Sequence, residues 1–451
     1  MTQSQDKEKV KEGAAAKTSA AAPERTYLGY EYIKTVEDIV EYRLKKNGLT
    51  VLVSEDHTAP IATVTVTYMA GSVHEVLGHT GVAHMLEHMM FKESENFRRK
   101  DKRDINNMLD KRGALLNAST WNDRTNYYEC IGAEHVETAI ALEADRMRRA
   151  ILEDKELQPE KVVVRNEYEI GQNDPIRVLY GELYATAFQV FPYHHDTLGH
   201  LSDIKGYSVG ELKTFYNTYY HPDNATVSVV GAISEKEALG FVREHFGVHE
   251  KSKESFPQID AEEPLQTGER RIRVKRQGSV NMVGVAHKKP GASHKDIPVL
   301  LVLSAILGDG KASVLHRALI DSGMATEVEV GAHPFRYESL FMSFATLTPE
   351  TTHDDVERII KDTYTEIAKK GVSEEVLERA KARLKAKYAF EMEGTMGVTG
   401  AVSEAAAVGD WTLAFTFPES VADVSVRDVK RVAKKYLKDD TCTVGYYEAT
   451  S

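Results

Sequence analysis

Three polar residues, His84, Glu87 and His88, interrupt an otherwise apolar run, GVAHMLEHMMF, at residues 81–91. The apolar residues of this run favour a helix, so we predict a buried helix over residues 80–91. On a helix, His84 and His88 lie one turn apart on the same face, where two imidazoles can bind one zinc ion. Glu87 reaches the same side, as a carboxylate that takes a proton from water must.

The order of these residues, HxxEH, is the inverse of the more familiar zinc motif HExxH. A chain with 17 His can contain such a short motif by chance, so the motif needs supporting context. The plainer interpretation is two histidines at the edge of the core, with Glu87 as a hydrogen-bond partner of one of them.

A zinc site with two histidines needs a third protein ligand and an open position. The segment PEKVVVRNEYEI begins at Pro159, which we expect as the first residue of a helix, and it offers Glu167 as the ligand. Glu160 lies two turns before Glu167 on the same face, so one carboxylate can bind metal while the other supports the site. Glu169 also fits the pattern, although it points elsewhere on the helix. Glu160 is explained equally well as an ordinary acid in a first helical turn.

Composition limits the class of protein. The chain has 451 residues and a hydrophobic fraction of 42%, which is typical of a globular protein with two to four domains. A net charge of −12 without a basic block argues against nucleic-acid binding, and no apolar run is long enough for a membrane span. Cys130 and Cys442 are too far apart in the sequence to indicate a disulfide framework or a cysteine zinc site.

The ends and joints of the chain are marked by polar segments. Residues 1–26 are Ala-rich and of mixed charge without an apolar core, which predicts a disordered tail and a cytoplasmic protein rather than a secreted one. Residues 248–266 are charged, carry two prolines and are predicted to be a linker. We therefore expect a zinc-binding catalytic α+β domain at 27–247 and a homologous domain without metal at 267–451.

The elements that must position the candidate site follow from periodicity. β-branched and alternating patterns predict strands at 48–54, 62–69, 116–121, 125–131, 226–230, 271–274 and 280–286, with a turn at Asn122-Asp123. Helical patterns predict helices at 100–111, 134–150, 177–188, 209–220, 234–246, 296–307, 353–369 and 374–388.

The sequence contains an internal repeat. Residues 208–212 (SVGEL) resemble residues 425–429 (SVRDV), and 226–227 then align with 443–444 without a gap. Two tandem copies of a unit of roughly 200 residues explain this, although two helix-then-strand units can also look alike by chance. In the second copy, the helix with the histidines corresponds to LLVLSA at 300–305, which offers no metal ligand. We expect only the first copy to bind metal, because three polar groups are costly to bury for packing alone.

Taken together, these motifs resemble the insulinase/pitrilysin family of zinc peptidases with the inverted motif. The resemblance rests on HMLEHMMF, LNASTWNDRTNYYE, LEADRM, EKVVVRNEYE, NDPIRVLYGELYATAFQVFPYHH and ILGDGKASVLHRAL. Within that family the chain looks most like the two-domain bacterial zinc peptidases and the catalytic subunit of mitochondrial processing peptidase. The implied fold is α+β, with two tandem homologous α/β-roll domains whose mostly antiparallel sheets carry packed helices.

The resemblance implies roles for the candidate residues. His84, His88 and Glu167 are implied as the ligands of one Zn²⁺ per chain. Glu87 is implied as the general base, and Glu160 is implied to assist catalysis.

The resemblance also implies how substrate is bound. Asn117, Ala118 and Ser119 match the edge strand on which family members bind an extended peptide by main-chain hydrogen bonds. The implied activity is that of a zinc metalloendopeptidase acting on unfolded or short peptides in an enclosed chamber. The implied assembly is a homodimer, or a heterodimer with a related chain.

One departure from the family pattern leaves alternatives open. Many relatives carry an Arg and a Tyr in the second half that contact substrate, whereas Ile320 and Thr326 stand near those places here. Arg336-Tyr337 or a partner chain could supply these contacts. The chain could therefore be a catalytic subunit that needs a separate partner, or a non-catalytic assembly protein that retains the fold.

Two further pairs, His194-His195 and Tyr127-Tyr128, invite a metal or substrate role. Adjacent histidines on a helix or turn point apart, so His194 and His195 are not expected to converge on one ligand. We expect both pairs to be structural.

Overall fold

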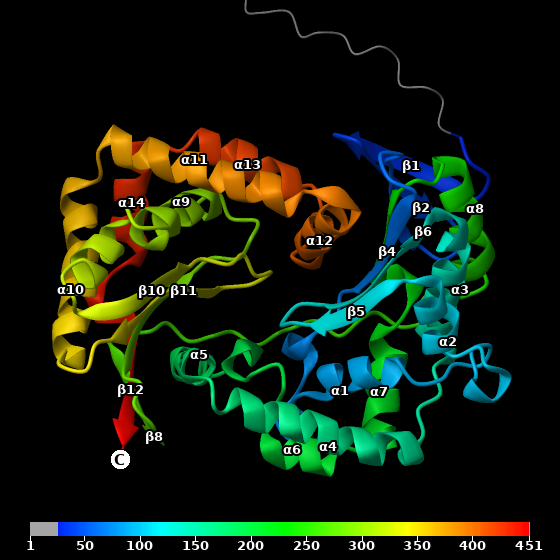
Figure 1. Cartoon of the computed structure of the whole chain (residues 1–451), viewed down its shortest axis with the longest axis horizontal. Coiled ribbons are helices and arrows are strands. Elements are labelled where there is room, and N and C mark those ends of the chain that lie inside the picture. Colours follow the sequence, from blue (N-terminus) through cyan, green and yellow to red (C-terminus); the bar gives the residue numbers. More distant parts are fainter. Residues whose placement is uncertain (1–25, 451) are drawn as a thin grey trace, which may run out of the picture.

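Alternation of apolar and polar residues builds two separate sheets in the computed structural model, which describes residues 26–450. Residues 1–25, where a tail is expected, and residue 451 lie outside the described residues. Figure 1 shows two lobes, each containing one sheet. Residues 248–266, the expected linker, contain no helix or strand and lead from one sheet to the other.

The first sheet has the strand order β1-β2-β3-β7-β4-β6-β5. Its strands are β1 (Tyr30–Val36), β2 (Ile39–Leu44), β3 (Thr50–Glu55), β4 (Ile61–Tyr68), β5 (Leu115–Thr120), β6 (Thr125–Gly132) and β7 (Ala225–Gly231). All neighbours are antiparallel except β3 and β7, which are parallel. Strand β5 lies at one edge, so its outer side has no strand partner among the described residues.

The second sheet has the strand order β10-β11-β9-β12-β8. Its strands are β8 (Arg270–Gln277), β9 (Met282–Lys289), β10 (Ala325–Gly331), β11 (Ser339–Leu347) and β12 (Cys442–Thr450). Only β12 and β8 are parallel. The order and directions match β5-β6-β4-β7-β3 of the first sheet, which is what a tandem repeat requires.

Helices pack on both sheets. The first half contains α1 (Val82–Met90), α2 (Ile105–Leu109), α3 (Val136–Arg149), α4 (Asp154–Gly171), α5 (Pro175–Ala187), α6 (Leu201–Gly206), α7 (Val209–Tyr219) and α8 (Glu235–Phe246). The second half contains α9 (Ile297–Gly308), α10 (His353–Lys370), α11 (Glu374–Glu391), α12 (Gly394–Ala407), α13 (Leu413–Ala422) and α14 (Val426–Tyr436). None of these helices has the length and apolar character needed to cross a membrane.

Every predicted strand is present, and most predicted helices are too, with ends within about three residues of those expected. Strands β1, β2, β10 and β11 and helices α6, α12 and α13 were not predicted, and α14 and β12 were expected only through the repeat, as the counterparts of α7 and β7. The helix expected at 100–111 is wrong in extent, because Lys102 adopts a left-handed conformation (φ 54°) that separates a short 3₁₀ turn from α2. The start expected at Pro159 is also wrong. Helix α4 begins five residues earlier, at Asp154, and contains Pro159 in its second turn.

The two lobes exchange one helix each. Figure 1 shows α5, from the first half, beside β8 and β12, whereas α12, from the second half, lies against β4 and β7. Leu179 and Leu183 of α5 pack closely on the second sheet at Gly284 and Gly445, where a Cβ would lie 2.7 Å from a leucine methyl. Each lobe therefore depends on the other to cover its sheet.

The alternating side chains of strand β4 contact the core of the first half on one face and α12 on the other. Its valines, Val64 and Val66, are buried in the main core of the first half. The threonines alternate with them, and Thr63 forms a hydrogen bond of 2.8 Å with Thr395 of α12. An alternating strand is thus buried on both faces.

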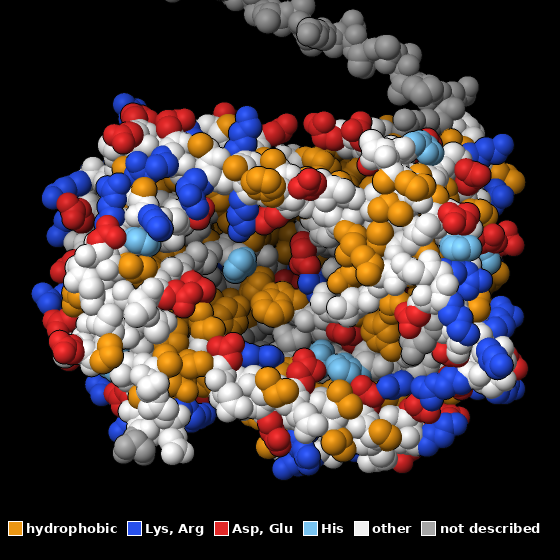
Figure 2. Space-filling model, viewed as in Figure 1, with side chains coloured by type: hydrophobic (Ala, Val, Ile, Leu, Met, Phe, Trp, Pro, Cys, Tyr) orange, Lys and Arg blue, Asp and Glu red, His pale blue; other side chains and the backbone are white. Residues whose placement is uncertain are grey.

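The lobes enclose a hollow. Figure 2 shows it near the centre of the molecule, with hydrophobic side chains on part of its wall. One cavity there, of about 650 Å³, is lined by Trp121 and Arg124 from the first half and by residues of α11 and α12 from the second. The candidate site opens beside this hollow, since Trp121 also lines a cavity next to His84.

Candidate metal centre and active site

The start of α1 is fixed by a buried carboxylate. Glu75 accepts hydrogen bonds from the backbone N–H groups of Gly81 (2.7 Å) and Ala83 (2.8 Å), which have no partner within the helix. Gly81 has φ +82°, and a Cβ there would lie 2.2 Å from the carbonyl oxygen of Leu198. The helix therefore begins at Val82 rather than at residue 80, and its rotation is set before the first histidine.

Helices α1 and α4 bring three possible ligands together. The Nε2 atoms of His84 and His88 are 3.3 Å apart, and the carboxylate of Glu167 lies 3.8 Å and 3.6 Å from them. Zinc–nitrogen bonds of about 2.0–2.1 Å in a tetrahedral site place two ligand nitrogens about 3.3 Å apart. The donor set and its spacing therefore fit a zinc ion.

The carboxylates around His88 favour positive charge. Burial lowers the pKa of His84 to about 4. Burial would also lower the pKa of His88, but its hydrogen bonds with Glu160 and Glu167 raise that pKa to about 9. A metal cation bound between the rings and Glu167 would supply this positive charge in place of a proton.

Glu160 contacts His88 at Nδ1, the ring nitrogen on the side away from the other possible ligands. Its carboxylate accepts a hydrogen bond from Nδ1 of His88 at 2.8 Å and another from Lys92. Burial would raise the pKa of Glu160, but these two hydrogen bonds outweigh it and hold the pKa at about 2. A carboxylate on the far nitrogen of a histidine ligand fixes the ring and its tautomer. The alternative of an acid in a first helical turn is wrong, because α4 begins at Asp154 and Glu160 is buried.

Glu87 faces the same cavity from α1. Its carboxylate accepts a hydrogen bond of 2.6 Å from the hydroxyl of Thr120, at the end of β5. Burial raises its pKa, which increases its tendency to take a proton. The hydroxyl of Thr120 fixes the direction in which the carboxylate points.

All the residues to which the resemblance assigns a role in the site line one cavity of about 620 Å³. They are His84, Glu87, His88, Asn117, Ala118, Ser119, Glu160 and Glu167, and sequence reasoning missed Phe91, Lys92 and Thr120, which line it as well. Lys92 stands four residues after His88, so helical spacing could have indicated it. Thr120 gave no signal of its own, since only the packing of α1 on β5 brings it to Glu87.

The rival candidates lie elsewhere. Glu169 points away from the cluster and pairs with Arg165 at 3.5 Å on the surface. Among residues 26–450, the groups with metal-ligand spacing both lie in the first half, and the second one, Glu137, Glu244 and His245, is on the protein surface.

Ile320 and Thr326, which stand near the places where many relatives carry substrate-contacting residues, also lie away from the candidate site. Ile320 packs against the core of the second half, and the hydroxyl of Thr326 lies 3.4 Å from the carbonyl of Thr346. Neither residue lines the cavities beside His84. The backbone N–H of Arg336 donates to Asp123 at 3.0 Å, and that of Tyr337 lies 3.4 Å from the hydroxyl of Tyr193.

The two neighbouring pairs differ in their surroundings. His194 donates a hydrogen bond of 2.9 Å to the carbonyl of Phe191, and the buried Tyr127 shares one of 2.9 Å with Tyr220. These contacts fit structural roles. His195 is buried as well, but it also lines a second cavity next to His84, which sequence reasoning missed.

Comparison of the sequence with models of known protein families gives one match in each half of the chain. The model described as Insulinase (Peptidase family M16) matches residues 50–200, and the model described as Peptidase M16 inactive domain matches residues 207–384. The chain belongs to the insulinase family of peptidases, M16. The inactive-domain match lies mainly over the half in which no metal-ligand group is found among the described residues.

Individual relatives extend over almost the whole chain. The Zinc protease PqqE of Helicobacter pylori is 29% identical over 403 residues, which cover 88% of this chain and 90% of that protein. The Mitochondrial-processing peptidase subunit beta of Lentinula edodes is 27% identical and covers 93% of this chain and 92% of its own length. These relatives support a hydrolase of the zinc protease class.

Solved structures agree on the two-lobed fold. The crystal structure of a protease from Helicobacter pylori matches with a TM-score of 0.85 and 28% identity, covering 93% of this chain and 99% of that chain. A peptidase M16 inactive domain from Pseudomonas fluorescens matches with a TM-score of 0.81 at 17% identity, covering 92% of this chain and 98% of its own, which shows the fold alone.

Proposed function

We propose that this chain is a zinc metalloendopeptidase that hydrolyses peptide bonds of unfolded or short peptides within the hollow between its lobes. The observation that carries the proposal is the convergence of two imidazoles, one ligand carboxylate and a separate buried carboxylate on one cavity beside an edge strand. A purely structural zinc site would not need Glu87.

Each residue has a distinct task in this proposal. His84, His88 and Glu167 would hold the zinc ion, and Glu160 would keep the ring of His88 in place. When bound, zinc acts as a Lewis acid that polarises the scissile carbonyl and acidifies water. Glu87, directed by Thr120, takes the proton from the attacking water and passes it to the leaving amine.

Strand β5 would bind the substrate. An extended peptide can pair with its free edge through main-chain hydrogen bonds, which serve many sequences equally well. Residues 117–119 line the same cavity as Glu87, so a peptide on this edge passes the catalytic groups. This arrangement favours unfolded substrates, because a folded chain does not offer a free strand.

The test pairs metal analysis with cleavage of a quenched fluorescent peptide. For the wild type we expect one zinc per chain and cleavage, whereas Glu87→Gln should keep the zinc and lose at least 10²–10⁴-fold in rate, the usual contribution of a general base. Glu156→Gln is the matched control, because Glu156 is a partly exposed residue of α4 that does not line the site and pairs with Arg99 at 3.0 Å. A wild type that binds no zinc while folded contradicts the metal site.

A second candidate function is that of a catalytic subunit which is inactive without a separate, related chain. Two observations favour it. Ile320 and Thr326 do not reach the site, and one relative is named as a subunit of a processing peptidase. Zinc binding without cleavage by the wild type, followed by cleavage after a related chain is added, would support this candidate over a homodimer. Zinc without cleavage under any condition would support a non-catalytic assembly protein.

A further inference from the structure

A second cavity adjoins the candidate site. It has a volume of about 390 Å³, shares His84, Thr120 and Glu167 with the catalytic cavity, and extends beyond the carboxyl end of β5. This volume is within the range of about 300–1,000 Å³ that is typical of small-ligand pockets. The metal cluster therefore lies between two cavities, one along β5 and one past its end.

The position of the second cavity fixes which part of a substrate reaches it. Strand β5 pairs antiparallel with β6, as β6 does with β4, and a peptide that continues this pattern runs antiparallel to β5. Its amino-terminal part then lies at the carboxyl end of β5, next to Thr120 and Trp121. A residue before the scissile bond would therefore place its side chain in the second cavity.

One wall of this cavity is apolar and aromatic. Ile176, Tyr180 and Tyr184 follow one another at intervals of four on α5, so they share one face of that helix. The rings of Tyr180 and Tyr184 are 4.9 Å apart. Trp121, which is 41% exposed, lines the same cavity from the end of β5. We call this cavity the aromatic pocket.

The depth of the aromatic pocket depends on Gly181. This glycine lies in the interior of α5, where glycine costs about 1 kcal/mol relative to alanine. Close packing does not require it, because a Cβ there would meet nothing within 4 Å. Its backbone has no left-handed φ that only glycine tolerates. The absence of a side chain at Gly181 therefore leaves free space in the pocket.

Apart from Glu167, which belongs to the group of possible metal ligands, the charged residues of the aromatic pocket pair with one another. Arg177 lies 3.5 Å from Asp196, and both residues line the cavity. His195, on the same wall, is buried, and burial lowers its pKa to about 4, so the ring is neutral near pH 7. A neutral side chain can therefore enter without leaving an unpaired charge, which would be costly.

Building on the proposed function, we propose that the aromatic pocket binds an aromatic or large aliphatic side chain on the amino-terminal side of the scissile bond, with Gly181 setting its depth. The substrates would then be peptides cleaved after large apolar residues. Arginine or glutamate at that position would be disfavoured, since each would enter beside a pair that is already balanced.

The test uses a set of quenched fluorescent peptides that differ only at the residue before the cleaved bond. This residue is Phe, Leu, Ala, Glu or Arg. We expect the wild type to cleave the Phe and Leu peptides with kcat/KM on the order of 10–100-fold above the Ala peptide, the usual range for an apolar pocket. Gly181→Leu should fill the pocket and reduce this ratio to near one. Gly240→Leu is the matched control, because Gly240 is also inside a helix with open space around it, in α8 far from the site.

A binding measurement separates this proposal from the proposed function. In Glu87→Gln loaded with zinc, the Phe peptide should bind more tightly than the Ala peptide, and adding Gly181→Leu should remove the difference. If the wild type cleaves nothing, the proposed function fails, and this binding arm still decides the pocket. Equal binding of both peptides, or a preference for Glu that Arg177→Gln abolishes, overturns the proposal.

Discussion

His88 is held by carboxylates on both of its nitrogens. Glu160 accepts from Nδ1 at 2.8 Å, and Glu167 lies 3.6 Å from Nε2. The first contact orients the ring, while the second belongs to the group of possible ligands. Orientation and ligation therefore come from one helix, since Glu160 and Glu167 are two turns apart on α4.

This arrangement predicts the effect of Glu160→Gln. The neutral amide supports the imidazole less well, so zinc affinity should fall about 10–100-fold, the usual cost of losing such a contact. Competition with a chelating dye measures the affinity. Glu156→Gln on the same helix should bind zinc as the wild type does, and equal affinities in all three proteins would contradict the role of Glu160.

A second residue-scale feature is the buried charge of Arg146. Its side chain, 2% exposed, pairs with Glu129 at 3.1 Å and with Glu143, and it lies over the ring of Tyr127. These contacts join α3 to the sheet directly behind α1. Removing the cation would leave two buried carboxylates without compensation.

We therefore expect Arg146→Met to lower the free energy of unfolding by about 3–5 kcal/mol, the usual cost of breaking a buried ion pair. Urea denaturation followed by circular dichroism measures it. Arg149→Met, whose guanidinium is 38% exposed and pairs with Asp145 at 3.2 Å, should cost at most about 1 kcal/mol. Similar losses for both variants would mean that the buried pairing contributes little.

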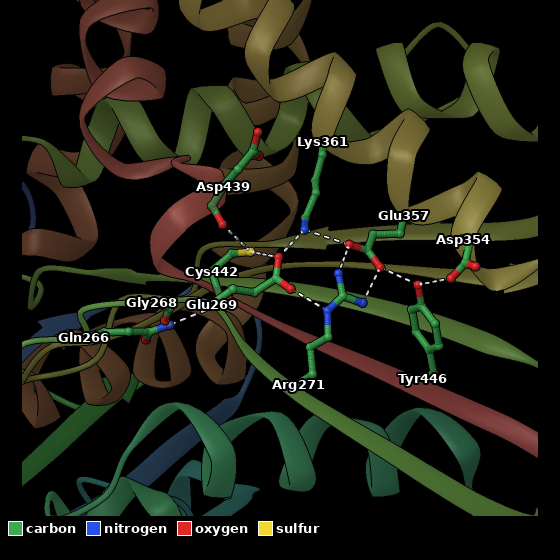
Figure 3. Close-up of polar contacts among 10 residues, drawn as sticks. All are labelled: Gln266, Gly268, Glu269, Arg271, Asp354, Glu357, Lys361, Asp439, Cys442 and Tyr446. Carbon is green, nitrogen blue, oxygen red and sulfur yellow. Dashed lines mark hydrogen bonds and ion pairs between the residues drawn. The ribbon is translucent and has the colours of Figure 1, made fainter.

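At the scale of elements, a charged cluster joins α10 to the edge of the second sheet. Figure 3 shows Glu357 of α10 between Arg271, Lys361 and Tyr446. Arg271 donates to it through two nitrogens, at 2.8 Å and 2.5 Å. Burial would raise the pKa of Glu357, but these partners outweigh it and hold the pKa at about 2. The ionised carboxylate is thus favoured by folding.

The sign of the pH effect follows from this lowered pKa. The stability that Glu357 contributes is complete above its unfolded pKa, about 4.5, and is lost as pH falls towards 2. Glu357→Gln should lower the free energy of unfolding by about 1–3 kcal/mol at pH 7, and this difference should shrink between pH 5 and pH 2. Denaturation curves over that range measure it. Glu366→Gln, which removes an exposed pair with Lys370 on α10, should show little effect, and a difference for Glu357→Gln that does not vary with pH would contradict the assignment.

At the scale of the whole molecule, the second half stabilises the strand end that borders the site. Asp123, in the turn after β5, is buried and accepts a hydrogen bond of 3.0 Å from the backbone N–H of Arg336 in the second half, besides one of 2.5 Å from the hydroxyl of Tyr193 in the first. Arg124, in the same turn, pairs with Glu404 of α12. The edge strand and Trp121 are therefore held in place from the half that has no metal cluster among its described residues.

The exchange of α5 and α12 predicts that the chain survives a cut in its connecting segment. A protease site inserted between Lys253 and Glu254, which are exposed, should be cleaved without separating the lobes, because apolar clusters around both exchanged helices hold them together. Gel filtration after cleavage should show one species containing both fragments. Fragments that elute separately would mean that the segment, rather than the exchange, holds the lobes.

The sequence alone determined features that depend on short spacing. His84, Glu87 and His88 share a helix face because the α-helix has a fixed period, and alternating patterns defined the central strands and the turn at 122–123. The repeat was also readable, since it is a property of the sequence itself. The resemblance to a family then supplied the roles that the structure makes geometrically possible.

Only the tertiary structure decided features that depend on contacts between distant segments. The position of Glu167, rather than Glu169, beside the two histidines and the contact of Glu160 with His88 follow from how α4 packs against α1, which local periodicity does not encode. Thr120, Lys92 and the aromatic pocket appear for the same reason. The exchange of α5 and α12 divides each half between two lobes, because apolar faces are buried against whichever sheet leaves them covered, irrespective of their order along the chain.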